Sequence, residues 1–346
     1  MTLTADVIMP IRNAARFIVP ALQSILAEPA LGVLIIVDDG STDDWQQVAS
    51  PHLCGARTKI IRQSPSGIAA ALNRGLAAST SVYAARMDAD DISLPGRLSA
   101  QISWMDAHPH LAAAGTQVTT MSDDGTSAKR SAFPTTPGGL REELYTRGRC
   151  AIAHPSVILR RADVLAVGGY RESFTYAEDF DLWLRLSETG AVSNMDACLL
   201  HVRTHPHQVS RVHKVRQAFN RDLALLSARE RAARRMDPAT ADIAALSYRE
   251  LQSTTYHPVI RKLALAYEAI ELLASGAHAP LPADAARVIP HLARDRYLGD
   301  ARRIRYDLIT RAGKDALRRG NLADAVTAYV TLARCRAHDS KYLRTT

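Results

Sequence analysis

"GVLIIVDDGSTDD", residues 32–44, contains the run of residues that decides the fold. Its apolar residues from Val33 to Val37 follow one another without alternation. A strand with that pattern is buried on both faces, as in a parallel sheet covered by helices. The run ends at Asp38 and Asp39. We therefore expect a central parallel strand whose carboxyl end carries two acidic side chains.

Neighbouring segments repeat this alternation of strand and helix. Further strands are predicted at 6–11, 58–63, 81–87 and 192–205, with a hairpin over 111–128. Helices are predicted at 20–28, 66–79, 95–108 and 178–190. Strands and helices that alternate over short connections indicate an α/β fold with a mostly parallel sheet.

Composition excludes several classes of protein. The 346 residues are 47% hydrophobic and 23% charged, which is ordinary for a globular chain of one or two domains. The four cysteines form no CxxC pair, so we expect neither a disulfide framework nor a zinc site, and reduced thiols fit a cytoplasmic protein. We find no signal peptide and no apolar run of the roughly 18 residues that a membrane span needs.

Charge is distributed unevenly along the chain. Residues 1–210 contain 18 Lys/Arg and 21 Asp/Glu, whereas residues 211–346 contain 25 and 14. The second part is almost entirely helical in pattern and is predicted to be a basic C-terminal extension. Its charge indicates either an anionic partner or a set of solvated Arg-rich helices, and both interpretations stay open.

A second acidic stretch, "YAARMDADDISLP" at 83–95, follows the predicted strand at 81–87. Ligands of open α/β sheets bind at the carboxyl ends of the strands. Carboxylate oxygens in an Asp-x-Asp pattern suit Mg²⁺ or Mn²⁺, so Asp88 and Asp90 are candidate metal ligands. The alternative is that Asp88, Asp90 and Asp91 only cap the following helix. The sequence has neither a Walker loop nor a GxGxxG motif, so a metal would neutralise a bound diphosphate.

Five motifs in order then resemble the family 2 glycosyltransferases of the GT-A fold. They are "VIMPIRN", "IIVDDGSTDD", "GIAAALNRGL", "ARMDADDISLPGRLSAQ" and "AEDFDLWLRL". The resemblance implies a GT-A catalytic domain at 1–210, with a nucleotide-sugar and metal half at 1–110 and an acceptor half at 111–210. It gives no counterpart for the extension at 211–346.

The resemblance also implies roles for the residues of the nucleotide half. Pro10 would line the nucleotide pocket, and Asp38 or Asp39 would bind the base. Asn73 and Arg74 would lie near the nucleotide. Asp88 would face the ribose and the metal, and Asp90 would ligate the metal, which is Mn²⁺ or Mg²⁺.

In the acceptor half, the resemblance makes Asp179 the catalytic base, with Glu178 as the rival. His154 would lie near the donor sugar or the acceptor, and His205 near the diphosphate or the metal. Two acidic residues in the first turn of a helix also suit the helix dipole, so a capping role for Glu178 and Asp179 is the alternative.

The resulting hypothesis is an inverting, metal-dependent glycosyltransferase. It would move a sugar from a nucleotide-sugar donor, with UDP favoured, to a glycan or lipid-linked saccharide in bacterial surface polysaccharide synthesis. Its basic extension is compatible with peripheral association with the anionic cytoplasmic face of the inner membrane. One alternative is a metal-dependent nucleotidyltransferase, although "PIRNAARF" lacks the glycine-rich loop of that class. Another is an inactive binding protein, but with 5% aromatic residues we expect no nucleic-acid partner.

Overall fold

The computed structural model describes residues 4–53, 57–123, 125–204, 213–239, 243, 246–253 and single positions between 258 and 271. The chain divides into two compact units, Met1–Val212 and His213–Thr346. His205 and most of the predicted extension lie outside the described residues. The nucleotide-sugar and metal role of residues 1–110, the acceptor role of 111–210 and the role of the extension at 211–346 stay predictions.

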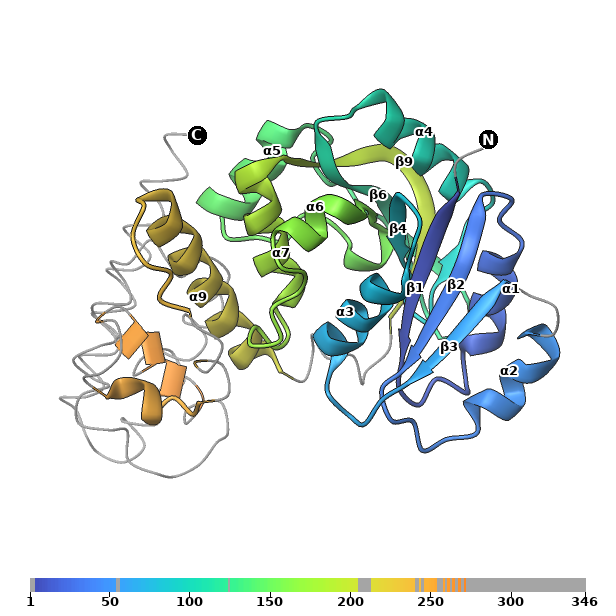
Figure 1. The fold of residues 1–346 in the computed structure, drawn as a ribbon, viewed down its shortest axis with the longest axis horizontal. Helices are drawn as coiled ribbons and strands as arrows, with labels where there is room; N and C mark the ends of the chain where they lie inside the picture. The colour runs from blue at the N-terminus through green and yellow to red at the C-terminus, as the bar shows by residue number, and fades with distance from the viewer. Residues whose placement is uncertain are drawn as a thin grey trace. The chain divides into compact units, whose positions relative to one another are not determined.

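The first unit is built on one nine-stranded sheet with the order β3-β2-β1-β4-β8-β6-β9-β5, in which β7 pairs with β6 (Figure 1). The strands are β1 (Ala5–Ile11), β2 (Leu31–Asp38), β3 (Thr58–Arg62), β4 (Tyr83–Arg86), β5 (Ile92–Ser93), β6 (Leu111–Met121), β7 (Ser127–Arg130), β8 (Ile158–Arg160) and β9 (Ala191–Arg203). Strands β1 to β4 are parallel to one another, whereas β8 is antiparallel to both β4 and β6. The predicted α/β class is confirmed, and the sheet is mixed beyond β4.

Helices cover both faces of the parallel strands. In the first unit they are α1 (Ile18–Leu26), α2 (Trp45–Leu53), α3 (Ile68–Ala78), α4 (Arg97–Ala107), α5 (Pro137–Arg141), α6 (Arg161–Ala166) and α7 (Glu178–Thr189). A π-helical turn, Glu142–Thr146, follows α5, and a 3-10 turn, His154–Ser156, precedes β8. Figure 1 shows α1 and α2 on one face of β1 to β3 and α3 on the other.

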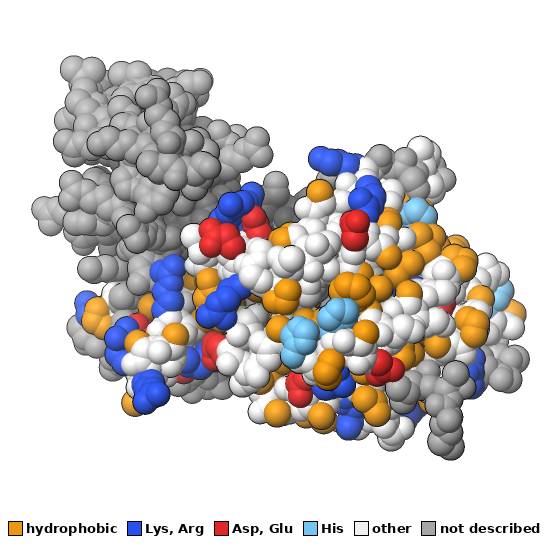
Figure 2. Space-filling view, turned by 90° about the horizontal axis from the view of Figure 1, so that it is seen from above, with side chains coloured by type: hydrophobic (Ala, Val, Ile, Leu, Met, Phe, Trp, Pro, Cys, Tyr) orange, Lys and Arg blue, Asp and Glu red, His pale blue; other side chains and the backbone are white. Residues whose placement is uncertain are grey.

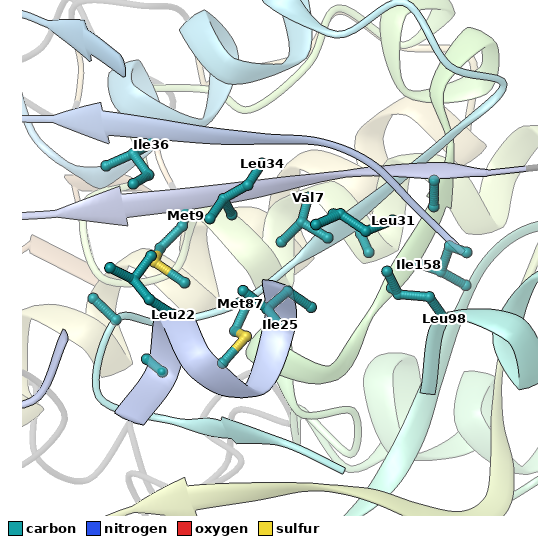
Figure 3. Packing of buried hydrophobic residues seen from close by; sticks show 14 of the residues in the cluster. Val7, Met9, Leu22, Ile25, Leu31, Leu34, Ile36, Met87, Leu98 and Ile158 are labelled. Carbon is teal, nitrogen blue, oxygen red and sulfur yellow. The ribbon is translucent and has the colours of Figure 1, made fainter. Parts of the chain in front are cut away.

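The continuous apolar run of β2 is divided between these two faces. Leu34 and Ile36 belong to the core on the α1 side, in which Leu22 and Ile25 point toward the sheet (Figure 3). Ile35 and Val37 pack on the other side, with Ala71 of α3. Burial on both faces is why the run does not alternate with polar residues.

Strand register brings the acidic segments to one edge of the sheet. Ile11 of β1 pairs with Asp38 of β2, and Ile8 pairs with Arg86 of β4. The residues that follow β2 and β4 therefore leave the sheet at the same end, as expected for parallel strands.

The described part of the second unit contains α9 (Lys214–Ala232) and a 3-10 turn, Glu250–Gln252. Phe219, Tyr248 and Tyr267 form a buried aromatic cluster in it, with edge-to-face contacts around Phe219. Among the described residues, no helix is long and apolar enough to cross a membrane. Figure 2, seen from the side on which β1 begins, shows Lys/Arg and Asp/Glu side chains mixed with hydrophobic ones.

Candidate active site

Three carboxylates gather just after β4. Oxygens of Asp88, Asp90 and Asp91 all lie within 4.8 Å of one another. Asp88 and Asp90 are half-buried, whereas Asp91 is 1% exposed. The predicted metal ligands are therefore brought together, and Asp91 forms the inner wall of their cluster.

Asp91 is the member that received no ligand role from the sequence. Its Oδ1 accepts a hydrogen bond from the Arg203 backbone N–H at 3.0 Å. Its buried Oδ2 has no hydrogen-bond partner within the described part of the chain. Burial, followed by the charges of Asp88 and Asp90, raises the pKa of Asp91 well above its usual value. An unpartnered buried oxygen beside two carboxylates is a donor set that suits a hard divalent cation.

Two arginines hold the loop that carries this cluster. The Arg86 guanidinium forms an ion pair with Asp88. Arg203, at the end of β9, donates from Nε to the Asp90 carbonyl at 3.0 Å. Arg203 Nη1 donates to the carbonyls of Ser122 and Asp123, in the turn between β6 and β7, at 3.1 and 3.0 Å. Neither arginine was assigned a role from the sequence. Arg86 did offer a signal, because it is a charged residue within the apolar run that precedes "DADD".

The carboxylates at the end of β2 are both buried and accept hydrogen bonds from two different loops. Asp38 accepts hydrogen bonds from Ser41 N at 2.8 Å and Trp45 Nε1 at 3.1 Å. Asp39 accepts from Gln63 Nε2, Ser66 N and Gly67 N at 2.7 to 2.9 Å. These bonds shape the edge of the sheet between β2 and α3. Binding of a base by either residue stays a prediction.

Residues predicted to surround the nucleotide lie on β1 and α3. Pro10 pairs with Val37 near the carboxyl end of β1. Arg74 is exposed on α3. Asn73, its neighbour, instead contacts the backbone of Tyr170 through Nδ2 and Oδ1, both at 2.8 Å. The structure thus gives Asn73 a bracing contact, and its nearness to a nucleotide stays a prediction.

Glu178 and Asp179 form the first turn of α7 and have different surroundings. Glu178 is 7% exposed, and its Oε2 has no hydrogen-bond partner among the described residues. Burial, followed by the charge of Asp179, raises the pKa of Glu178 to about 8. Asp179 is half-buried and accepts from Phe180 N at 2.7 Å and from the Cys150 thiol at 3.6 Å. Two adjacent carboxyl groups in unlike environments are typical of acid and base pairs.

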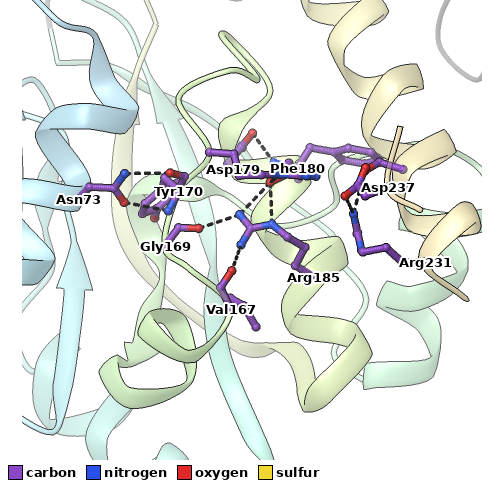
Figure 4. Close-up of polar contacts among 12 residues, drawn as sticks. Asn73, Val167, Gly169, Tyr170, Asp179, Phe180, Arg185, Arg231 and Asp237 are labelled. Atoms are coloured by element: carbon purple, nitrogen blue, oxygen red, sulfur yellow. Dashed lines mark hydrogen bonds and ion pairs between the residues drawn. The ribbon is translucent and has the colours of Figure 1, made fainter. Parts of the chain in front are cut away.

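The tight turn at residues 167–170 is held by hydrogen bonds from side chains of two helices (Figure 4). Gly168 and Gly169 adopt positive φ angles of 85° and 68°, as expected for a turn that needs glycine. Asn73 of α3 holds Tyr170, and Arg185 of α7 donates to the carbonyls of Val167 and Gly169, each at 2.7 Å. Helices α3 and α7, which carry the motifs "GIAAALNRGL" and "AEDFDLWLRL", are therefore linked through this turn.

His154 lies in the interior behind the turn. Its Nε2 is 2.9 Å from the Tyr170 hydroxyl, and its ring meets Trp183 edge-on. Burial, followed by the charge of Arg86, lowers its pKa well below the usual value, so the ring is neutral. Leu182, Trp183 and Leu186 are fully buried and belong to the core. The substrate contact predicted for His154 is not tested by these contacts and stays a prediction.

Comparison with known proteins decides the family. The model of the family "Glycosyl transferase family 2" matches residues 6–168. The putative glycosyltransferase EpsE of Bacillus subtilis is 31% identical over 205 residues, which are 57% of this chain and 72% of EpsE. The chain belongs to glycosyl transferase family 2. This glycosyltransferase is also 33% identical to the amylovoran biosynthesis glycosyltransferase AmsE of Erwinia amylovora, over 51% of this chain and 66% of AmsE.

Solved structures show the same fold for this glycosyltransferase. The S. aureus TarS fragment 1–349 with UDP-GlcNAc matches with a TM-score of 0.57 and 15% identity, over 94% of this chain and 90% of that one. The mannosyltransferase PcManGT of Pyrobaculum calidifontis, with GDP-Man and Mn²⁺, matches with a TM-score of 0.51 and 15% identity, over 96% and 88%. The predicted GT-A fold is confirmed, and family membership favours a glycosyltransferase over the nucleotidyltransferase alternative.

Proposed function

We propose that this glycosyltransferase moves a sugar from a nucleotide-diphosphate donor, with a UDP-sugar favoured, to a saccharide or lipid-linked saccharide in bacterial surface polysaccharide synthesis. Relatives named for amylovoran, succinoglycan and O-antigen biosynthesis support the pathway class. The complex of TarS with UDP-GlcNAc supports the donor class.

The cluster of Asp88, Asp90 and Asp91 at the carboxyl edge of the parallel strands is the observation that carries the proposal. Asp88 and Asp90 would hold Mn²⁺ or Mg²⁺, with Asp91 behind them. A bound cation would act as a Lewis acid that stabilises the charge on the departing nucleoside diphosphate. His205, predicted beside the diphosphate, lies outside the described residues.

Asp179 is proposed as the general base. The acceptor hydroxyl attacks the anomeric carbon as the bond to the diphosphate oxygen breaks, and its proton passes to the Asp179 carboxylate. Glu178 is buried and holds a proton at neutral pH, so the half-buried Asp179 is the better placed acceptor of that proton. One base without a nucleophilic carboxylate implies a single displacement with inversion.

Thermal unfolding with UDP, dTDP, GDP and CDP, each with Mn²⁺ or EDTA, tests the proposal. A ligand at 100 times its Kd stabilises a protein by about 2.7 kcal/mol. We expect UDP to stabilise the protein only with the metal, and Asp90→Ala to abolish the shift. Asp196→Ala, at an exposed aspartate of β9, is the matched control. If no nucleotide shifts the unfolding temperature of the parent protein with either metal, the proposed donor site is wrong.

The basic extension supports a further part of the proposal, peripheral association at the anionic cytoplasmic face of a membrane. Residues 211–346 contain 25 Lys/Arg against 14 Asp/Glu. Basic residues near an anionic bilayer contribute about 1 kcal/mol each, and salt screens the attraction. Co-sedimentation with phosphatidylglycerol vesicles that falls with added salt is expected, with phosphatidylcholine vesicles as the control. Equal sedimentation with both vesicle types would argue against this placement.

A further inference from the structure

Arg86 is a buried cation at the proposed metal site, and the mechanism above does not use it. We propose that Arg86 is a positioning residue that aims the Asp88 carboxylate at the bound cation. This inference rests on the proposed function, because it assumes that Asp88 and Asp90 hold a metal. It assigns the metal affinity partly to a residue that does not touch the metal.

The ion pair between Arg86 and Asp88 has two points of contact. Arg86 Nη1 lies 2.8 Å from Asp88 Oδ2, and Nη2 lies 2.5 Å from Oδ1. The Arg86 side chain is 4% exposed, whereas that of Asp88 is 34% exposed. A carboxylate offers about four lone-pair sites, and a two-pronged guanidinium contact uses two of them. The fork therefore approaches Asp88 from the interior and leaves its remaining lone pairs for a cation.

The backbone of Arg86 is held from two directions. Its N–H donates to the Val157 carbonyl at 2.9 Å. Its carbonyl accepts from Nη2 of Arg97 at 2.7 Å, and the same nitrogen donates to the Pro155 carbonyl at 3.0 Å. Arg97 is itself fully buried and is bonded to Gln101 at 3.0 Å. The Arg86 end of the ion pair thus starts from a fixed strand, so its guanidinium orients Asp88 before any ligand binds.

Charge gives Arg86 a second reason to occupy this position. Three carboxylates lie within 4.8 Å of one another, and their repulsion needs a nearby positive charge when no metal is bound. Arg86 also acts electrostatically on Glu178 and Tyr170. Its positive charge therefore acts on both the acidic cluster and the first turn of α7. Direct contact with the donor diphosphate is disfavoured, because the Arg86 side chain is only 4% exposed.

Lysine is the informative substitution. Arg86→Lys keeps the positive charge but loses the planar fork that orients the carboxylate. Partners that orient metal ligands typically contribute about 10- to 100-fold to metal affinity. We expect the Mn²⁺ concentration for half-maximal activation, and the Mn²⁺ Kd measured by titration with UDP present, to rise by that factor. Arg160→Lys, at a mostly buried arginine of β8 outside the site, is the control.

Direct Mn²⁺ binding, followed by electron paramagnetic resonance, separates this inference from the proposed function. If Asp90→Ala binds Mn²⁺ as the parent does, the metal site itself is wrong. If Asp90→Ala loses Mn²⁺ but Arg86→Lys binds it with the parent Kd, the role of Arg86 is wrong and the metal site stands.

A double-mutant cycle with Asp88→Asn excludes a merely structural role. If Arg86 acts through Asp88, adding Arg86→Lys to Asp88→Asn changes the Mn²⁺ Kd less than about twofold, since effects of coupled residues do not add. A further 10- to 100-fold loss in the double variant would overturn the proposal. Should Arg86→Lys fail to fold, Arg86→Gln replaces it in the same cycle, because glutamine keeps a donor toward Asp88.

Discussion

Asn73 and Tyr170, 97 residues apart in the chain, form a paired contact in which the Asn73 amide binds both polar groups of the Tyr170 backbone. Nδ2 donates to the Tyr170 carbonyl and Oδ1 accepts from its N–H, each at 2.8 Å. This contact joins α3 to the turn before α7. An asparagine suits this position, because its amide offers a donor and an acceptor side by side.

Replacing Asn73 by aspartate tests whether this residue braces the turn or binds the nucleotide. A carboxylate cannot donate to the Tyr170 carbonyl, which is left without its partner at a cost of about 1–3 kcal/mol. We expect lower stability in chemical denaturation and a lower kcat, with the UDP Kd within about twofold of the parent because no nucleotide contact is lost. A loss of UDP affinity as large as the loss of kcat would instead support the nucleotide role implied by the family resemblance.

Gly169→Ala is expected to destabilise the protein more than Gly168→Ala. Both glycines have positive φ angles, so both variants carry the strain of about 1 kcal/mol or more that a side chain meets there. Only at Gly169 does an added Cβ collide, at 2.7 Å from Asn73 Oδ1, whereas nothing lies within 4 Å at Gly168. Urea unfolding gives the free energy of unfolding of each variant, and the difference between the two measures the cost of the collision. Equal losses would show that Asn73 moves aside without cost.

Glu178→Gln is expected to stabilise the protein at high pH and to have little effect at low pH. Burial and the charge of Asp179 raise the Glu178 pKa to about 8 in the folded state, while Arg86 opposes the shift and Tyr170 faces the same group. The ordinary pKa of a glutamate is near 4.5, so between that pH and pH 8 the folded protein binds more protons than the unfolded chain. Stability therefore falls as the pH rises through that window.

Denaturant unfolding at pH 4 and pH 8.5 measures this dependence. Each pKa unit corresponds to about 1.4 kcal/mol, so the gain from Glu178→Gln at pH 8.5 is expected to be on the order of a few kcal/mol. Glu188→Gln, on the last turn of the same helix, is the exposed control. A gain that is equal at both pH values would contradict a raised pKa for Glu178.

Asp179→Asn is expected to lower kcat by about 10²–10⁴-fold while UDP binding is kept, because general base catalysis contributes that factor and the nucleotide is bound elsewhere. Turnover with a UDP-sugar and calorimetric binding of UDP measure the two effects. Glu178→Gln serves as the comparison within the pair. If Glu178→Gln lost as much kcat as Asp179→Asn, the assignment of the base to Asp179 alone would be wrong.

The buried parallel strand β2 followed from local pattern alone. The unbroken run Val33–Val37 has alternate residues on two covered faces, with Ile36 toward α1 and Ile35 toward α3. The spacing of apolar residues is a property of the segment itself, so a single sequence is enough to recognise a strand that is buried on both faces. The pairing of Asp88 and Asp90 was predicted in the same way, from their Asp-x-Asp spacing at the end of a strand, whereas the part of Asp91 in the cluster was not.

The contacts that complete the site come from distant parts of the chain and have no local signal. Arg203 reaches Asp90 across 113 positions, and Asn73 reaches Tyr170 across 97. Burial of Glu178 and of Arg86 likewise depends on which segments cover them. The sequence by itself determined a parallel α/β core and an acidic edge, since both are local patterns. Only the tertiary structure decided which carboxyl group keeps its proton and which arginine orients Asp88, because burial and pairing of charges arise when distant segments meet.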